Sequence, residues 1–278
     1  MSQSVPLSPR LPQYSSNSLS LRQAGLWPSR TPGNFIFMPM AFMIFIATWQ
    51  CVVWWTAYPA FILPAPTDVA TTLIRVITDG TLWFHAQATF FEILMGLILG
   101  VMTATILGYA IAKSQLLEQI LSPYLVALQS VPVVAIAPLM IIWFGGGYLS
   151  KIFVCALIVF FPVLINTVVG IRSVEPNLRD LMRSLQASRW QTFTMLEFPA
   201  ALPVFFGGLK VGVTLSVIGA VVGEFMGANQ GLGFLINQAR GLFDTSLVFV
   251  AILTLATITL TMYGLVGLLE KRLLHWRS

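Results

Sequence analysis

Six stretches of this chain are long and apolar enough to cross a lipid bilayer, and they constrain the fold more than any other feature. A helix needs about 20 consecutive apolar residues to span the hydrocarbon core. Lipid offers no partner to backbone N–H and C=O groups, so such segments form helices, which satisfy these groups internally. Apolar residues make up 57% of the chain and charged residues only 9%, which predicts an all-α polytopic membrane protein. The predicted transmembrane helices are Phe35–Trp55, Ala88–Ala112, Ser122–Phe144, Ile152–Ile171, Val204–Met226 and Leu247–Leu269.

Prolines are expected to interrupt two of these spans. A proline inside a helix removes one hydrogen-bond donor and clashes with the preceding turn. Pro132 and Pro138 lie in the third predicted span, and Pro162 lies in the fourth. Irregular backbone at membrane depth is tolerated where it lines a cavity. We therefore expect Ser130, Pro132, Pro138 and the run Gly145–Gly147 to form an irregular, cavity-facing segment.

The basic residues predict the orientation, because Lys and Arg are retained on the cytoplasmic side of a membrane. With the N-terminus inside, Arg75, Lys151 and Arg240 fall outside and Lys210 falls within a span. The inverted topology would leave only those three inside, so both termini are predicted to be cytoplasmic. Basic residues on the cytoplasmic side face the anionic lipid headgroups there. This excess explains the net charge of +5, so a nucleic-acid partner is not needed. The predicted cytoplasmic basic residues are Arg10, Arg22, Arg30, Lys113, Arg172, Arg179, Arg183, Arg189, Lys271, Arg272 and Arg277.

The spans divide the chain into five parts. Residues 1–33 are rich in Ser, Pro and Gln, a composition typical of a disordered tail. The predicted order is a disordered cytoplasmic tail (1–33), a first transmembrane helix (34–56), an extracytoplasmic segment (57–87), a transmembrane core (88–270) that contains a polar cytoplasmic loop (172–203), and a cytoplasmic C-terminal tail (271–278).

Motifs for catalysis and metal binding are missing from the sequence. Without a Gly-Lys dipeptide the chain has no phosphate-binding loop of the GxxxxGK[ST] type, and GxSxG is also absent. Glu92 and Glu224 lack an adjacent nucleophile, and His85 and His275 have no partner at ligand spacing. We therefore expect no enzymatic activity, no metal site and no cofactor bound by this chain. Energy for any transport would come from a partner protein or from an ion gradient.

The polar loop predicts a first amphipathic helix. Pro176 suits the first helical position, where its missing N–H has no acceptor to lose. The polar side of this loop carries Arg179, Arg183 and Arg189. Apolar side chains recur at the spacing of one helical face, and these are Leu178, Leu181, Met182 and Leu185.

A second helix is predicted to follow at once. Ser188 and, three residues later, Gln191 form a capping-box pattern, and the helix is expected to end at Pro199. Such a helix–turn–helix can lie in a groove of a cytosolic protein, or it can rest on lipid headgroups as an interfacial element. Spacing alone leaves both interpretations open.

The sequence of this loop, DLMRSLQASRWQTFTMLEFPAALP from Asp180, resembles the EAA motif of ATP-binding-cassette importer permeases. In that motif a Glu-Ala-Ala triplet is followed three residues later by Gly and then by a Pro-containing stretch. Gln186 stands where the Gly would supply a positive φ, so it must adopt a costlier backbone or lengthen the first helix. The resemblance implies an ATPase-coupling loop in which Asp180, Leu181 and Met182 stand at the triplet, together with Leu178, Leu185, Gln186, Ala187, Ser188, Pro199 and Pro203.

Other stretches carry the resemblance toward one branch of these permeases. The similarity is to permeases for nitrate, sulfonates, taurine and vitamin precursors, and it implies a MetI-like core of five spans preceded by one extra N-terminal helix. It also implies two ATP-binding subunits that hold the ATP and Mg²⁺, an extracytoplasmic solute-binding protein, and a second permease subunit, identical or paralogous, in a bacterial inner membrane. The matching stretches are Leu63–Val69, Ser130–Gly147, Phe160–Ile171, Gly208–Phe225 and Gly231–Ala239.

The translocation path and the solute are predicted from intramembrane charges. Glu92 and Glu224 are costly in lipid and should face protein or water, either as structural partners, which we favour, or as contacts to solute. Lys210 lies about four turns from Glu224 on the same helix, too far to pair with it. The path candidates are therefore Ser130, Pro132, Pro138, Glu92, Lys210 and Glu224.

A permease that works by alternating access, driven by separate ATPases, is the predicted function. With Lys210 as the one cation within a predicted span, a neutral or aromatic solute such as riboflavin or a thiamine pyrimidine precursor is favoured over sulfonate, taurine or nitrate. The alternative is an ion-coupled secondary transporter, which would show internal repeats that this sequence lacks. A membrane-bound enzyme is a third class, and it would need a reactive cluster.

Overall fold

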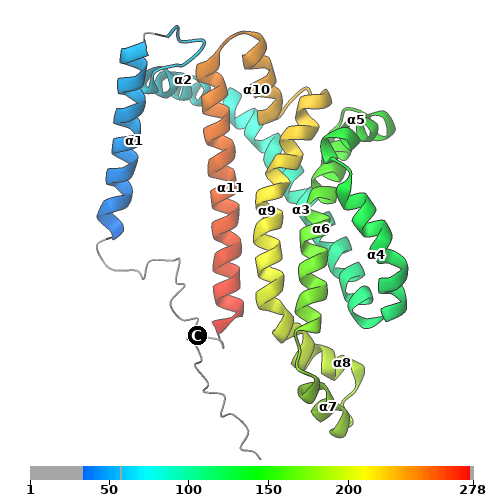
Figure 1. Ribbon diagram of the computed structural model, residues 1–278. Coiled ribbons are helices and arrows are strands. Elements are labelled where there is room, and N and C mark those ends of the chain that lie inside the picture. Colours follow the sequence, from blue (N-terminus) through cyan, green and yellow to red (C-terminus); the bar gives the residue numbers. More distant parts are fainter. Residues whose placement is uncertain (1–33, 57, 276–278) are drawn as a thin grey trace, which may run out of the picture. The chain divides into compact units, whose positions relative to one another are not determined.

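The computed structural model describes residues 34–56 and 58–275 (Figure 1). Within that part of the chain every regular element is a helix, and no strand occurs. The predicted tail, residues 1–33, and the last three residues lie outside the described part. The helices are α1 (Asn34–Thr56), α2 (Pro66–Thr78), α3 (Thr81–Lys113), α4 (Gln115–Ser130), α5 (Val133–Phe144), α6 (Tyr148–Arg172), α7 (Pro176–Ser184), α8 (Arg189–Thr192), the π-helical turn η2 (Phe193–Glu197), α9 (Phe198–Gly227), α10 (Leu232–Gly241) and α11 (Thr245–Leu273).

Five continuous apolar segments are long enough to cross a membrane, and a bent pair of helices forms a sixth candidate. Each of the six spans expected from the sequence falls on one of them, which confirms an all-α polytopic membrane protein. α1 is a single helix that contains Pro39. The continuous candidates are Pro39–Thr56, Thr81–Lys113, Tyr148–Arg172, Arg189–Gly227 and Thr245–Leu273, and the bent pair is Gln115–Ser130 with Val133–Phe144.

The third expected span is two helices rather than one interrupted helix. α4 and α5 meet at an angle of 94°. Val131 and Pro132 between them are extended, with φ/ψ of −77°/124° and −61°/122°. A residue before proline is pushed out of the helical region, so the chain bends at this point. Pro138, in contrast, lies inside α5 and does not break it.

Pro162 does not interrupt the fourth span, contrary to the expectation from sequence. α6 continues past it for ten residues, and the Asn166 side chain donates a 2.8 Å hydrogen bond to the Pro162 carbonyl. A helix in lipid keeps the rest of its hydrogen-bond ladder because the alternative is unpaired backbone, so one lost donor is tolerated.

Close contacts between small residues hold α3, α6 and α9 together. α6 packs along both of the other helices. Cys155 is fully buried on α6 between Gly96 of α3 and Gly219 of α9. A Cβ atom added at Gly96 would lie 2.3 Å from Cys155 Cβ, and one added at Gly219 would lie 2.9 Å from Cys155 Cα. Membrane helices approach this closely where small residues allow their backbones to meet. These three helices form the core of the protein.

Two shorter helices lie at the end of the core opposite α7 and α8 (Figure 1). α2 begins at Pro66 and packs against α11, and α10 packs against both α9 and α11. The segment expected to be extracytoplasmic therefore contains α2 and the first turn of α3, which begins after Gly80 at φ 79°. This end and the α7–α8 end are the two poles of the core.

Candidate functional site

The segment between α6 and α9 forms two short helices at one end of the core (Figure 1). As the sequence predicts, α7 begins with Pro176 at its first helical position. Leu178 and Leu181 of α7 and Leu185 directly after it are 42%, 53% and 68% exposed, so they do not pack in the protein interior. We call these three leucines the exposed apolar face. Apolar side chains gathered on one exposed face mark a surface for interaction.

The turn after α7 places Gln186 in the left-handed region, at φ 54°. The Gln186 N–H donates to the Arg183 carbonyl at 2.9 Å, and the Ala187 N–H donates to the Met182 carbonyl at 3.0 Å. These two bonds form a Schellman motif, in which glycine usually occupies the position that Gln186 holds here. Of the two possibilities expected from sequence, the costlier backbone is the one adopted, and the first helix is not lengthened.

α8 begins with the predicted capping box. The Gln191 N–H donates to Ser188 Oγ at 3.2 Å, and the Ser188 N–H donates to Gln191 Oε1 at 2.8 Å. The sequence suggested that this helix ends at Pro199. In the structure it continues through η2 into α9 instead. Proline clashes with the carbonyl four residues earlier in a regular helix, and the wider π turn over Phe193–Glu197 relieves that clash. Pro203 lies inside α9.

Three polar contacts tie this loop to the membrane helices. Arg172 at the end of α6 makes two 2.7 Å bonds to the carboxylate of Glu118 on α4. Arg179 of α7 donates to the Ile171 carbonyl at 2.7 Å. Lys113, the last residue of α3, pairs with the buried carboxylate of Glu197 in η2. The loop is therefore bonded directly to α3 and α6, and its last turn, η2, continues into α9.

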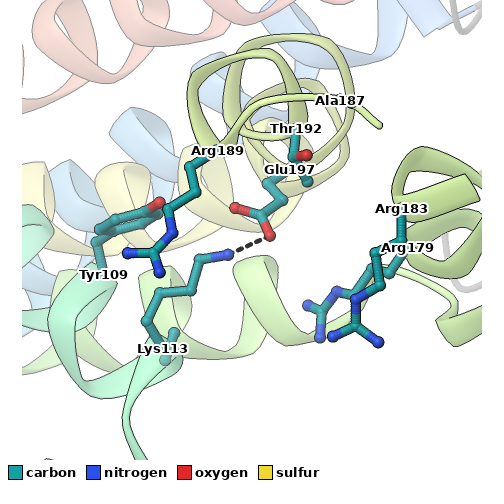
Figure 2. Close-up of a pocket in the computed structure, with 9 residues that line it drawn as sticks. Tyr109, Lys113, Arg179, Arg183, Ala187, Arg189, Thr192 and Glu197 are labelled. Atoms are coloured by element: carbon teal, nitrogen blue, oxygen red, sulfur yellow. Dashed lines mark hydrogen bonds and ion pairs between the residues drawn. The ribbon is translucent and has the colours of Figure 1, made fainter. Parts of the chain in front are cut away.

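A groove of about 920 Å³ opens between the loop and the end of α3 (Figure 2). We call it the basic groove, because four cationic side chains and one carboxylate line it. Figure 2 shows Lys113 reaching Glu197, with the side chains of Arg179 and Arg183 pointing into the same space. The charged residues of the groove are Lys113, Arg179, Arg183, Arg189 and Glu197.

The acids predicted as path candidates lie at the opposite end of the core, in one buried cluster. Glu92 of α3 and Glu224 of α9 are neighbours and are almost completely buried. Lys151 of α6 is equally buried, and its ammonium lies 3.1 Å from Glu92 Oε1. Thr89 of α3 donates a 2.6 Å hydrogen bond to Glu224. We call Thr89, Glu92, Lys151 and Glu224 the buried charge cluster.

The buried charge cluster also holds the chain between α9 and α10. The Gly233 N–H donates to Glu224, and the Leu232 N–H donates to Thr89 Oγ1 at 2.7 Å. Gly231, at φ 114°, donates to His85 Nδ1 at 3.1 Å. A side chain at Gly231 would collide with the Glu224 carboxylate. The start of α10 is thus fixed directly over the cluster.

The remaining path candidates lie apart from this cluster. Lys210 of α9 pairs with Glu270 of α11, so it joins two helices. Ser130, Pro132 and Pro138 are exposed around the break between α4 and α5. The structure brings Glu92 and Glu224 together and leaves Lys210, Ser130, Pro132 and Pro138 elsewhere.

Lys151 is the charged member of the buried charge cluster that sequence reasoning missed. It was expected outside the membrane, because it directly precedes the fourth apolar window. Two buried carboxylates are costly without a cation, and this requirement was the available signal. Thr89 and His85 gave no comparable signal, because single polar residues are common near helix ends.

Comparisons with known proteins identify the family of this chain. Residues 96–275 match the family described as "Binding-protein-dependent transport system inner membrane component". The chain is 47% identical over 252 residues to the riboflavin transport system permease protein of Chloroflexus aurantiacus, which covers 91% of this chain and 92% of that protein. It is 35% identical to an aliphatic sulfonates transport permease protein of Bacillus subtilis, over 84% of this chain and 85% of that one. A crystal structure of an amino acid ABC transporter shares the fold, with a TM-score of 0.54 and 15% identity over 73% of this chain and 96% of its own.

Proposed function

The chain belongs to the family of binding-protein-dependent transport system inner membrane components, and from this premise we propose that α7 and α8 couple it to an ATPase and that its solute is riboflavin or a similar uncharged aromatic molecule. It is a multi-pass inner-membrane permease of an ATP-binding-cassette importer, not an ion-coupled carrier. The family implies an ATPase and a solute-binding protein as partners.

The observation that carries the coupling role is the exposed apolar face. Leu178, Leu181 and Leu185 lie at α7, which a hydrogen bond from Arg179 joins to α6, and the same loop is joined to α3 by the Lys113–Glu197 ion pair. An amphipathic helix that presents apolar side chains in this way docks into a groove of a partner. Because the segment between α6 and α9 is mostly helical, a movement of the partner can be transmitted to α6 and α9 without being absorbed by a flexible linker.

The proposed topology has α7, α8 and both termini in the cytoplasm. The ion pairs of Arg172 and Lys113 and the basic groove all lie at the α7–α8 end of the core. Because Lys and Arg are retained on the cytoplasmic side of a membrane, these cations support a cytoplasmic position for this end. We propose an assembly of two such permeases, identical or paralogous, with two ATP-binding subunits that bind ATP and Mg²⁺, and one solute-binding protein at the opposite end.

The mechanism follows from two states of this assembly. Nucleotide binding brings the two ATPases together, the docked α7–α8 loops follow, and the core helices tilt so that the central cavity opens outward. Hydrolysis and product release reverse the tilt. The binding protein and the nucleotide each favour one state, so transport is a shift of population between inward-open and outward-open forms.

The charges within the spans support an uncharged solute. The core helices α3, α6 and α9 contain three lysines in the described chain, and each pairs with a glutamate: Lys113 with Glu197, Lys151 with Glu92 and Lys210 with Glu270. No lysine in this part of the chain is left to attract a sulfonate. The relative that transports riboflavin is also more similar to this chain than the sulfonate permease is.

The coupling role is tested with Leu181→Asp/Leu185→Asp, which puts two carboxylates on the exposed apolar face. We expect the variant to fold and to lose the co-purifying ATPase activity that the tagged wild type carries in mild detergent. Leu181→Met/Leu185→Met is the matched control, because it changes the same two side chains and keeps both of them apolar and of similar volume. Full ATPase activity with the leucine variant would overturn the coupling role.

The solute is tested by uptake of labelled riboflavin and labelled alkanesulfonate into the native bacterium with and without this chain. We expect riboflavin uptake alone to depend on the chain, to stop on ATP depletion and to survive an uncoupler. If the cells lose sulfonate uptake instead, riboflavin is not the solute, and the proposed coupling role is unaffected. Uptake that collapses with the uncoupler and survives ATP depletion would contradict ATP-driven transport.

A further inference from the structure

The basic groove holds more positive charge than the protein itself neutralises. Lys113 pairs with Glu197, and Arg183 lies 3.1 Å from Asp180 in an exposed pair. One guanidinium nitrogen of Arg179 donates a hydrogen bond to the Ile171 carbonyl, and the Arg179 Nε is buried without a hydrogen-bond partner. Arg189 makes no ion pair with any residue of the described chain. Two guanidinium groups therefore remain available to an anion inside the groove.

An apolar groove of about 330 Å³ lies beside the basic groove, between α3, α6 and α9. Its lining consists almost entirely of aliphatic and aromatic side chains, among them Ile106, Phe193, Phe198 and Phe205. Ile106 is 69% exposed and Phe198 50% exposed, so the groove opens to the surroundings of the helices rather than into the core. α3 and α9 are membrane spans, so those surroundings include lipid.

Tyr109 joins the two grooves, because its side chain lines both of them. One edge of its ring packs against Phe193 with ring centroids 5.2 Å apart. The Lys113 ammonium lies 5.7 Å from the centroid of the same ring. Tyrosine is typical of the membrane–water interface, where its ring is apolar and its hydroxyl is hydrated. The two grooves thus form one continuous surface that is basic at one end and apolar at the other.

We propose that this surface binds an anionic phospholipid, with the phosphate between Arg179 and Arg189 and one acyl chain in the apolar groove. Guanidinium groups bind phosphate oxygens through paired hydrogen bonds. Basic pockets at the ends of membrane helices are suited to anionic headgroups. A soluble phosphate would use only the basic groove, and an acidic segment of a partner protein would leave the apolar groove empty. The lipid is the ligand that accounts for both parts.

A bound lipid would tie the α7–α8 loop to the core. Its phosphate would contact α7 and α8, while its acyl chain would lie against α3 and α9. The lipid would then act as an additional link between the loop and the helices that the loop moves. The binding itself does not rest on the proposed coupling or on the proposed solute, since it needs only this chain and a membrane.

The test measures binding to the full chain, purified and delipidated in mild detergent, by native mass spectrometry. The probes are dioleoyl phosphatidylglycerol, dioleoyl phosphatidylcholine and inorganic phosphate. We expect one phosphatidylglycerol to remain bound, with the affinity falling about fivefold for each cation removed in Arg189→Gln and Arg179→Gln/Arg189→Gln. Arg189→Gln removes no side-chain hydrogen bond or ion pair within the described chain, so it separates binding from folding.

The matched control is Lys271→Gln/Arg272→Gln, which removes two cations at the end of α11 outside the groove. It should bind phosphatidylglycerol as the wild type does. Equal binding of the two lipids, or unchanged binding in both arginine variants, would overturn the proposal. Competition by millimolar inorganic phosphate would assign the groove to a soluble anion, and displacement of the lipid by a docked ATPase would assign it to that partner.

Discussion

Replacing Lys151 with methionine should cost more stability than any other single loss of a charge in this protein. Methionine keeps the length and most of the apolar volume of the lysine, so the substitution removes mainly the charge. Lys151 is fully buried, and its ammonium lies 3.1 Å from Glu92 Oε1 beside a second carboxylate, Glu224. The variant would leave two carboxylates in the protein interior without a cation.

The magnitude follows from two independent limits. Breaking a buried ion pair by removing one partner typically costs about 3–5 kcal/mol. Alternatively, a carboxyl group can take up a proton, and at pH 7 this costs an ordinary glutamate about 3.7 kcal/mol. The smaller of the two applies, so we expect Lys151→Met to lower the free energy of unfolding by about 3–4 kcal/mol. The melting temperature should fall by about 10 °C.

The double variant Lys151→Met/Glu92→Met should recover most of this loss. It replaces the buried pair by apolar side chains of similar volume, which is often neutral for stability. Thermal unfolding in mild detergent measures the cycle, with a thiol-reactive fluorophore that reports the exposure of the buried Cys155. A Cys51→Ser background is required, because Cys51 is exposed and would react in the folded state.

The control for the substitution is Lys271→Met, which removes an exposed lysine and should leave the melting temperature unchanged. Additivity in the cycle, with the double variant as unstable as the two single losses combined, would show that Lys151 and Glu92 do not depend on each other. A melting temperature of Lys151→Met close to that of the wild type would refute the reasoning altogether.

Three further predictions concern the turn, the cap and the core. Gln186→Gly should stabilise the α7–α8 turn by about 1 kcal/mol, because glycine adopts a positive φ without strain, and hydrogen exchange of the loop amides should slow. Ser188→Ala should remove the capping-box acceptor at a cost of about 1 kcal/mol and speed the exchange of the Gln191 amide. Gly96→Ala should lower the melting temperature through overpacking worth about 1–3 kcal/mol, whereas Gly264→Ala, where no atom lies within 4 Å, should not.

Much of the fold could be predicted because lipid leaves few options for a chain of this composition. Five of the six apolar windows fall on single helices and the sixth on the bent pair α4–α5, since helical backbone satisfies its own polar groups inside a bilayer. The capping box at Ser188 and the helix start at Pro176 could also be predicted from sequence, because both depend on residues within one turn of each other. Local hydrogen bonding fixes such features whatever surrounds them.

Features that depend on contacts between distant segments could not be predicted. Pro132 signals a break, but the 94° angle between α4 and α5 depends on what α5 packs against. Pro162 carries the same local signal and breaks nothing, because α6 is held on two sides by α3 and α9. The pairing of Lys151 with Glu92 joins two helices across the core, so spacing along the chain contains no trace of it.

The two sets of polar contacts lie at opposite poles of the same three helices, and this limits how the loop can move the core. At one pole Glu92, Lys151 and Glu224 join α3, α6 and α9, and at the other pole Lys113 and Arg179 join the loop to α3 and α6. Between the poles, glycine contacts leave no space for the helices to slide past one another. If α7 and α8 are displaced, we therefore expect α3, α6 and α9 to tilt as one rigid body rather than to bend. α4 and α5, which are not among these three helices, meet at a break, so we expect the angle between them to change as that body moves.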